Sequence, residues 1–247
     1  MGSNKNIKHV IAVASGKGGV GKSSVTCLLA VSLARQGFKV GIMDADVTGP
    51  SIPKLLGLNG HPEREGDYLV PLKTELGIKI MSLNLLLEQA DQPVIWRGPI
   101  ISKVVIQFWE EIAWGDLDYL VIDLPPGTGD VPLTVLQSIP VEGIMMVTTP
   151  QDLAGMVVSK AINMAKKMEI PIIGLIENMS YLVCPDCGKR IEVFGSSKVE
   201  TMGEKYGIKV LGRIPLDPNL VKLSDQGQIE KYESLSLFNN INNFLAE

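Results

Sequence analysis

A glycine-rich segment near the start of the chain has the residue types that bind nucleotide phosphates. Glycines let a backbone wrap closely around phosphate oxygens, and inward-pointing N–H groups followed by a helix N-terminus attract negative charge. Residues 16–24 have this composition, after an apolar run and before a helical pattern. We expect ATP or ADP to bind this cradle, which comprises Gly16, Lys17, Gly18, Gly19, Val20, Gly21, Lys22, Ser23 and Ser24.

Two side chains of the cradle have separate expected tasks. Lys22 should lie against the β- and γ-phosphates, and the Ser23 hydroxyl should coordinate Mg²⁺, which keeps several waters in such sites. The alternative is a glycine-rich turn that binds nothing. The flanking strand and helix patterns, together with the terminal Lys-Ser pair, disfavour that alternative.

Aspartates follow two other apolar runs of the sequence. Asp44 and Asp46 come after the run at 39–43, and Asp123 ends the run at 119–123. Ligands of parallel sheets bind at the carboxyl ends of strands, so these carboxylates should stand near the cradle. A single aspartate in such a place is as often a turn or helix cap. Three at the edge that carries a phosphate cradle favour a functional site.

The second lysine of the cradle, Lys17, makes the segment resemble the deviant Walker A family, which includes MinD, ParA and the nitrogenase iron protein. The resemblance implies that Lys17 reaches across a dimer interface to the partner's nucleotide; a solvated loop charge is the alternative. It also implies that Asp123 holds Mg²⁺ through water and that the glycines after it sense the γ-phosphate. Asp46 is the candidate for positioning the attacking water, and Asp44 for supporting the metal or the cradle. Lys17, Lys22 and Asp46 are thus the predicted catalytic residues.

The same resemblance indicates residues for the nucleotide base. Asn178 follows the apolar run at 170–177, where the family uses an asparagine to read adenine. Pro215 and Asp217 belong to a segment, 213–217, that resembles the family's second base-flanking segment. Asn and Pro after a strand are also ordinary turn formers, which is the alternative.

A separate pair, Cys184 and Cys187, forms a C-x-x-C knuckle whose thiolates can face one metal. A closed tetrahedral site needs four ligands, and the other soft candidates, Cys27, His9 and His61, have no matching spacing. Two such pairs in a two-fold dimer would supply four thiolates. Thiolate geometry suits iron-sulfur and zinc alike, and a redox dithiol or a disulfide-prone loop are further alternatives. Cys27 is expected to be a buried small hydrophobe.

Longer stretches narrow the resemblance. Segments 44–51, 96–99, 123–130 and 178–180, with the Cys-x-x-Cys pair downstream, resemble the Mrp/NBP35 group of iron-sulfur cluster carrier ATPases, to which ApbC and Ind1 belong. The resemblance covers nearly the whole chain. It implies a homodimer that holds a labile [4Fe-4S] cluster between the Cys184 and Cys187 pairs and transfers it to apoproteins, with ATP as a regulator. Iron-sulfur is favoured over zinc by this resemblance alone.

Some features depart from the group or stay unassigned. The extra N-terminal domain of many bacterial members and the four-cysteine N-terminal motif of the NBP35 branch are absent, which predicts a minimal, carrier-only version. Hydrolysis should be slow, because no intrinsic catalytic arginine or glutamine is identifiable beside the switches. The role of Trp96 and Arg97 does not follow from the sequence.

The main alternative is a positioning ATPase of the MinD or ParA kind without a cluster. MinD-like membrane binding calls for a basic amphipathic C-terminal helix, but residues 234–247 contain no Lys or Arg. A ParA-like protein needs a basic patch for DNA, which the net charge of −4 opposes. A reductase like the nitrogenase iron protein has a cluster cysteine beside its switch, and residues 123–130 contain none.

The elements that must position these residues alternate between two patterns. Strand-like apolar runs lie at 9–15, 39–43, 78–83, 119–123, 143–148, 170–177 and 208–214, and helix-periodic segments at 22–36, 100–113, 153–168, 199–206 and 234–245. This predicts an α/β fold, a mostly parallel doubly wound sheet flanked by helices, of the P-loop NTPase type seen in MinD, ParA and the nitrogenase iron protein. We expect one domain, 1–247, with a metal loop at about 180–195 and an excursion at 57–73.

Composition bears on where the protein works. Hydrophobic residues make up 45% of the chain, yet no apolar run approaches the ~20 residues that span a bilayer. The N-terminus lacks the pattern of a secretory signal, and three cysteines fit a reducing compartment better than a disulfide framework. We therefore expect a cytoplasmic homodimer whose partners are apoproteins, not membranes or nucleic acids.

Overall fold

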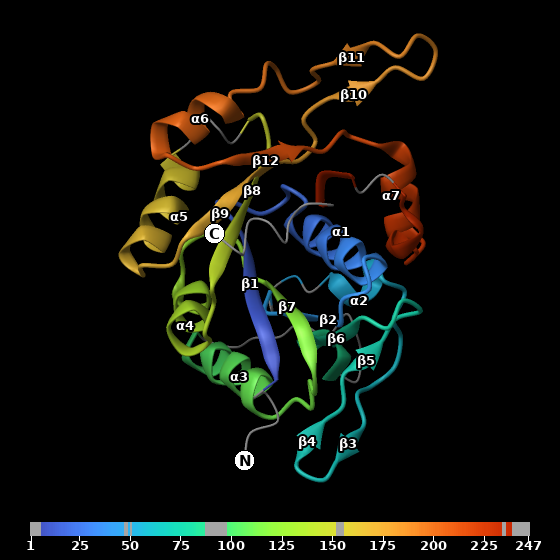
Figure 1. Cartoon of the computed structure of the whole chain (residues 1–247), viewed down its shortest axis with the longest axis vertical. Helices are drawn as coiled ribbons and strands as arrows, with labels where there is room; N and C mark the ends of the chain where they lie inside the picture. The colour runs from blue at the N-terminus through green and yellow to red at the C-terminus, as the bar shows by residue number, and fades with distance from the viewer. Residues whose placement is uncertain are drawn as a thin grey trace.

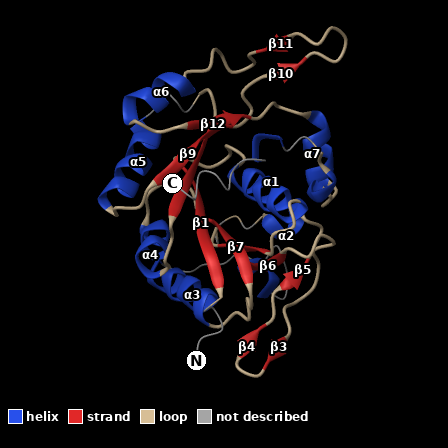
Figure 2. Ribbon diagram, viewed as in Figure 1, coloured by secondary structure: helices blue, strands red, loops and turns tan. Residues whose placement is uncertain are grey.

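A sheet of eight strands, counted over the described residues, lies at the centre of the molecule (Figures 1 and 2). This computed structural model describes residues 6–46, 49, 51–86, 98–151, 156–233 and 236–238. Across the sheet the strands are β12 (Val210–Arg213), β9 (Ile172–Glu177), β8 (Gly143–Thr148), β1 (Ile7–Ser15), β7 (Leu117–Asp123), β2 (Val40–Asp44), β6 (Lys79–Ser82) and β5 (Leu72–Lys73). Neighbouring strands are parallel except β5 and β6, which are antiparallel.

The strands are continuous apolar runs because helices cover both faces of the sheet. On β1, Val10, Ala12 and Ala14 pack into one core while Ile11 and Val13 pack into the other. Side chains of α3 (Gly98–Glu110), α4 (Asp130–Ser138), α5 (Met156–Lys167) and α6 (Val199–Tyr206) line the first core. The second core is lined from α1 (Lys22–Arg35), α2 (Ile52–Leu55), α7 (Pro218–Asp225) and the 3₁₀ turns η1 (Leu83–Leu86), η3 (Ile229–Lys231) and η4 (Ser236–Phe238). The predicted doubly wound parallel architecture is confirmed.

Two small hairpins extend from this body. The first, β3 (Arg64–Glu65) and β4 (Tyr68–Leu69), occupies the predicted excursion at 57–73. The second, β10 (Leu182–Val183) and β11 (Arg190–Ile191), follows the carboxyl end of β9 and projects beyond β12 (Figure 1). This second hairpin carries the cysteine pair.

The predicted elements match the observed ones with small shifts at their ends. Strand β8 and helix α6 have the predicted bounds, whereas α3 starts two residues earlier than predicted and ends at Glu110. The helices α2, α4 and α7 were not predicted. The structure does not describe Trp96 and Arg97. It also leaves out nearly all of the predicted helix at 234–245, where only residues 236–238, the 3₁₀ turn η4, are described. Within the part of the chain that the structure describes, no helix is long and apolar enough to cross a membrane.

Candidate functional site

The predicted phosphate cradle connects the end of β1 to the start of α1. Gly19 and Gly21 have φ angles of 79° and 78°, in the left-handed region that favours glycine. Gly21 caps α1, and a Cβ atom there would lie 2.2 Å from the Nδ2 atom of Asn178, so no side chain fits. The loop therefore follows a path that only its glycines allow.

A cavity of about 450 Å³ opens in front of this loop. Cradle residues form most of its wall, and α2 and the segments after β2 and β7 form the remainder; the lining residues are Ser15, Lys17, Gly18, Gly19, Val20, Gly21, Lys22, Ser23, Ser24, Asp46, Gly49, Ser51, Leu55 and Pro126. Gly16 is buried and is not part of the wall. The cavity is of a size typical of small-molecule sites.

The carboxyl ends of β2, β6 and β7 bring polar side chains together beside the cavity. Asp44 is in register with Asp123 on β7 and with Ser82 on β6. The prediction that Asp44 and Asp123 meet at one sheet edge is confirmed, and Asp46 follows two residues after β2 ends.

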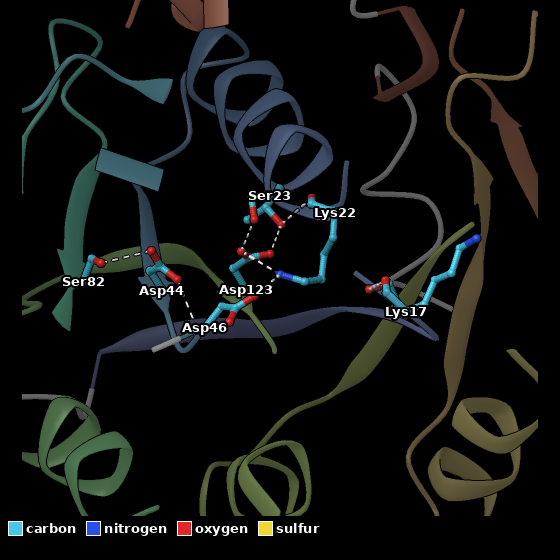
Figure 3. A network of polar contacts seen from close by, with 9 residues as sticks. Lys17, Lys22, Ser23, Asp44, Asp46, Ser82 and Asp123 are labelled. Atoms are coloured by element: carbon cyan, nitrogen blue, oxygen red, sulfur yellow. Dashed lines mark hydrogen bonds and ion pairs between the residues drawn. The ribbon is translucent and has the colours of Figure 1, made fainter. Parts of the chain in front are cut away.

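Asp123 is the centre of this group (Figure 3). It is fully buried, and the Nζ atom of Lys22 lies 2.8 Å from its Oδ2 atom. Ser23 donates a hydrogen bond of 2.6 Å to Oδ2, and Thr26 donates one of 2.7 Å to Oδ1. A buried carboxylate is stable only with such partners, and here helix α1 supplies all three.

Lys22 has a second acidic neighbour in Asp46. The Nζ atom lies 3.6 Å from the Oδ2 atom of Asp46, and the lysine side chain is only 6% exposed. Asp46 is 8% exposed and lines the cavity. The lysine charge is thus enclosed between two carboxylates at the floor of the cradle, beside the space that a phosphate would occupy.

Asp44 lies beneath this layer and does not line the cavity. Ser82 donates to its Oδ2 atom at 3.0 Å, and the backbone N–H of Asp46 donates to its Oδ1 atom at 3.1 Å. Burial, together with repulsion from Asp123, raises the pKa of Asp44 to about 8. Asp44 supports the turn that positions Asp46.

Lys17 is exposed at the mouth of the cavity and points away from the Lys22–Asp123 group (Figure 3). Its carbonyl accepts a hydrogen bond of 3.0 Å from the Ser15 hydroxyl. The loop is anchored at this point while the lysine side chain extends outward.

The glycine-rich segment after Asp123 is fastened to the end of β1. The backbone N–H of Leu124 donates to Val13, at 3.0 Å, and that of Gly127 donates to Ser15, at 2.9 Å. Pro126 forms part of the cavity wall. The predicted switch therefore lies against the cradle, as a segment that senses a phosphate requires.

The three residues expected at the base have different surroundings. Asn178 is 5% exposed, and its Nδ2 atom donates to the carbonyl of Val20 in the cradle at 2.9 Å. The segments that follow β9 and β12 run together, since Ser180 donates to Ile214 at 2.9 Å and Leu216 donates to Tyr181 at 2.7 Å. Pro215 lies in the second of these segments, half-buried.

Asp217 has a structural task at the start of α7. Its carboxylate accepts the backbone N–H of Asn219 at 2.8 Å and the hydroxyl of Tyr232 at 2.9 Å. The first contact caps the helix, which is the ordinary use of an aspartate at this position. Contact with a base stays a prediction for this residue.

Cys184 and Cys187 stand on the turn between β10 and β11, and both thiols are free. The turn is closed by hydrogen bonds of 2.9 Å from Gly188 to Cys184 and from Cys184 to Lys189. Backbone N–H groups of Cys187 and Asp186 donate to the Cys184 sulfur and lower the pKa of that thiol. A thiolate is the form that binds metals.

Cys27 is buried in α1, as expected, and its burial raises the pKa of its thiol. Within the described residues there is no cluster of three or more His, Cys, Asp or Glu side chains that could hold a metal. The described part of one chain therefore offers two thiolates at the knuckle and no third ligand of these types.

Some residues of the site were not predicted. Thr26 has a hydroxyl on the buried face of α1, four residues after Lys22. Ser82 is the last residue of β6, near the end of a predicted strand and at the same sheet edge as the aspartates. Applying the strand-end rule to hydroxyls as well as carboxylates would have found Ser82. The contact between Asn178 and the cradle has no signal in the sequence, because it depends on how β9 packs beside β8 and β1.

Residues 6–246 match the family model described as ParA, NUBPL iron-transfer P-loop NTPase. The chain is 46% identical over 241 residues to an iron-sulfur cluster carrier protein of Clostridium perfringens, covering 94% of this chain and 84% of that one. A nucleotide-binding protein from Archaeoglobus fulgidus, solved in complex with ADP, matches with a TM-score of 0.83 and 49% identity, covering 92% of this chain and 89% of that one. The MinC:MinD complex of Aquifex aeolicus matches with a TM-score of 0.63 at 21% identity, covering 97% of this chain and 96% of that one, which is a likeness of fold alone.

Proposed function

This chain belongs to the NUBPL iron-transfer family of P-loop NTPases, and from that premise we propose that it is an ATP-binding carrier of iron-sulfur clusters. Nucleotide and Mg²⁺ bind at the cradle between β1 and α1. A labile [4Fe-4S] cluster, the cargo, binds at Cys184 and Cys187 and passes from there to apoproteins.

The residues around the cradle fit a nucleotide with magnesium. Lys22 exchanges its ion pair with Asp123 for phosphate oxygens, and the Ser23 hydroxyl and the Asp123 carboxylate, 2.6 Å apart, are the hard oxygen ligands that Mg²⁺ prefers. Bound Mg²⁺ supplies neutralisation of phosphate charge. The relative from Archaeoglobus fulgidus, solved with ADP, supports this use of the site.

Hydrolysis is the finer part of the proposal. Asp46, at the cavity wall 3.6 Å from Lys22, orients the attacking water, and Lys17 of a second copy completes the site from across a dimer interface. The outward direction of Lys17 supports this role (Figure 3). Turnover is slow, because the described wall of the cavity contains no arginine or glutamine.

Ligand arithmetic supports a homodimer around the cluster. The knuckle offers two thiolates, while a [4Fe-4S] cluster takes four cysteine ligands. Two-fold symmetry supplies the other pair without any further residue. The relative of Clostridium perfringens, which is named a cluster carrier, supports iron-sulfur over zinc as the cargo.

The proposal also covers the domain organisation of the chain and the compartment in which the protein works. Both cores belong to the two faces of one sheet, which supports a single ATPase domain over 1–247 with the cysteine loop as an extension. Free thiols at Cys27, Cys184 and Cys187 support a reducing compartment, and we assign the protein to the cytoplasm. The MinD likeness extends to the fold alone and favours no positioning function.

The observation that carries the proposal is the pair of free thiols on the turn between β10 and β11. This hairpin follows the carboxyl end of β9, and the phosphate cradle follows the carboxyl end of β1 in the same sheet. Its test is cluster transfer: anaerobically reconstituted protein is mixed with an apo-enzyme that requires a [4Fe-4S] cluster, and enzyme activity is followed. We expect activity to appear with the wild type and with Cys27→Ser, and to be absent with Cys184→Ser and Cys187→Ser. Equal recovery with all four proteins would exclude the knuckle as the carrier site.

A further inference from the structure

Glu177, the last residue of β9, is a fully buried carboxylate that the proposed chemistry does not use. It accepts hydrogen bonds from the hydroxyls of Ser180 and Ser197, the latter at 2.9 Å, and the Nε atom of Arg213 lies 3.8 Å away. A buried charge is costly unless such partners compensate it. The carboxylate therefore holds these partners in place.

The two serines stand at the two ends of the cysteine loop. Ser180 precedes β10 and Ser197 follows β11, so the chain from 181 to 196, with both cysteines, leaves and returns at one carboxylate. Ser197 also accepts the backbone N–H of Val199 at 3.4 Å, where α6 begins. The position of Glu177 thus determines where the cysteine loop is anchored.

The next residue in the chain faces the phosphate cradle. Asn178 donates to the carbonyl of Val20, and the Cα atom of Gly21 approaches so closely that a Cβ atom would overlap the Asn178 amide. Its own N–H donates to Thr148 on β8 at 2.8 Å. A change in the path of the cradle at Val20 and Gly21 therefore cannot leave Asn178 undisturbed.

Met179 joins this contact to the anchored loop in a strained conformation. Its φ is 54°, in the left-handed region, which costs a residue with a side chain about 1 kcal/mol or more. Such a backbone persists only where its neighbours hold it, and here Asn178 is held by the cradle and Ser180 by Glu177. Releasing either contact frees the residue between them.

We propose that Glu177 and Asn178 are positioning residues that couple the phosphate cradle to the cysteine loop. Nucleotide in the cradle changes the contact between Asn178 and Val20, and the shift passes through Met179 to the Ser180 and Ser197 anchors. The exposure and reactivity of Cys184 and Cys187 then depend on nucleotide within one subunit. This inference rests on the proposed function only in taking the cradle as a nucleotide site.

The test compares thiol reactivity with and without nucleotide in reduced, cluster-free protein. The rate at which a thiol reagent modifies the cysteine pair is measured with and without Mg-ATP, and ATP affinity is measured separately by calorimetry. Cys27 is buried with 0% exposure, so the pair provides the signal. We expect nucleotide to change the wild-type rate on the order of fivefold, the lower end of usual coupling between sites.

The variants remove one anchor while leaving the cradle intact. Ser197→Ala should bind ATP like the wild type but lose the nucleotide effect on thiol rate, and Ser197→Thr, which keeps the hydroxyl, should regain it. Ser196→Ala, at an exposed neighbouring serine, is the matched control and should behave like the wild type. A purely structural role for Ser197 would alter stability and leave the nucleotide response in place.

The remaining outcomes are decisive in the other direction. ATP binding without a change in wild-type thiol rate overturns the coupling and leaves the proposed function standing, as does a full nucleotide effect in Ser197→Ala. An effect that appears only at high protein concentration assigns the protection to dimer formation and also overturns the coupling. Wild-type protein that binds no ATP overturns the proposed function and this inference together.

Discussion

Charge pairing at single residues explains how charged side chains are stable when they are buried at the cradle. Lys22 is buried beside two carboxylates, Asp123 and Asp46, so a positive charge and a negative charge that would each be costly alone compensate each other. A nucleotide phosphate can replace the carboxylates as the partner of Lys22. The same side chain thus forms ion pairs within the cradle and is placed to pair with a phosphate.

Lys22→Ala should abolish ATP binding measured by calorimetry, because the phosphates lose the one buried cation among the described residues of the cavity wall. Lys54→Ala, which alters an exposed lysine on α2 near the cavity, is the control and should bind ATP normally. An unchanged dissociation constant for Lys22→Ala would remove the basis for the phosphate site.

Binding and turnover should separate at Lys17 and Asp46. Lys17→Ala and Asp46→Ala should keep appreciable ATP affinity, because Lys22 and the backbone cradle remain, but phosphate release should fall to the background rate. The measurement is steady-state phosphate release beside calorimetry on the same samples. Wild-type turnover in both variants would contradict the proposed roles in water positioning and across the dimer.

The raised pKa of Asp44 predicts that the stability of the nucleotide-free, metal-free protein depends on pH. Burial raises its pKa to about 8 in the folded state, whereas the unfolded carboxyl titrates near its ordinary value. Between about pH 4 and pH 8 the folded state therefore binds the extra proton, and stability falls as pH rises, by about 1 kcal/mol per pH unit.

Denaturant unfolding at several pH values checks this slope, with Asp44→Asn as the comparison. The variant side chain cannot ionise, so its stability should change less between pH 5 and pH 8 than that of the wild type. Parallel curves for the two proteins would show that Asp44 is ionised throughout this range.

At the scale of helices and strands, the sequence predicted the frame well because the strands are buried on both faces. Continuous apolar runs such as β1 and β8, which alternate with helix-periodic segments, are typical of parallel strands covered on both faces. The glycine cradle marks where β1 ends. Helix α4 was not predicted, and the glycines before it and Pro132 within its first turn are residues that local patterns associate with turns. Helix α7 was not predicted, although Asp217 as cap and Pro218 at the first position are an ordinary helix start.

The site was predictable where it depends on strand ends and not where it depends on packing between distant segments. Asp44, Asp123 and the cradle could be placed together because parallel strands end at one edge. The hydrogen bond from Asn178 to Val20 joins residues far apart in the chain, and no local pattern encodes it. Contacts between residues this far apart in the chain can be identified only once the fold is known.

Asp217 has two possible roles, the observed one as the cap of α7 and the predicted one as a contact to the nucleotide base, and substitutions can separate them. Asp217→Ala should destabilise the protein by about 1 kcal/mol through loss of the α7 cap, and Asp217→Asn, also a good cap, should restore most of it. Thermal unfolding gives the stabilities, and calorimetry gives the ATP affinity. If the two variants weaken ATP binding equally while only the first is destabilised, the carboxylate contacts the nucleotide.

The whole molecule combines an α/β domain, which carries the phosphate cradle, with an exposed hairpin that carries the cysteine pair. The central sheet holds the cradle, and the β10–β11 hairpin, whose turn contains Cys184 and Cys187, projects away from the body. Figure 1 shows the direction of this hairpin. Two thiolates of one chain cannot complete a cluster, so the proposed function requires two copies to bring their hairpins together. Cluster content is therefore expected to depend on dimer formation.

The most direct measurement is the iron content of anaerobically reconstituted protein, with its molar mass in solution, for the wild type and matched cysteine variants. We expect about four irons and four sulfides per dimer, with a broad visible charge-transfer band, as one [4Fe-4S] cluster requires. Cys187→Ser should lose the iron and still bind ATP, whereas Cys27→Ser, altered at a buried cysteine, should keep it. Colourless protein with tightly held zinc, or iron retained after both Cys184 and Cys187 are replaced, would contradict the account.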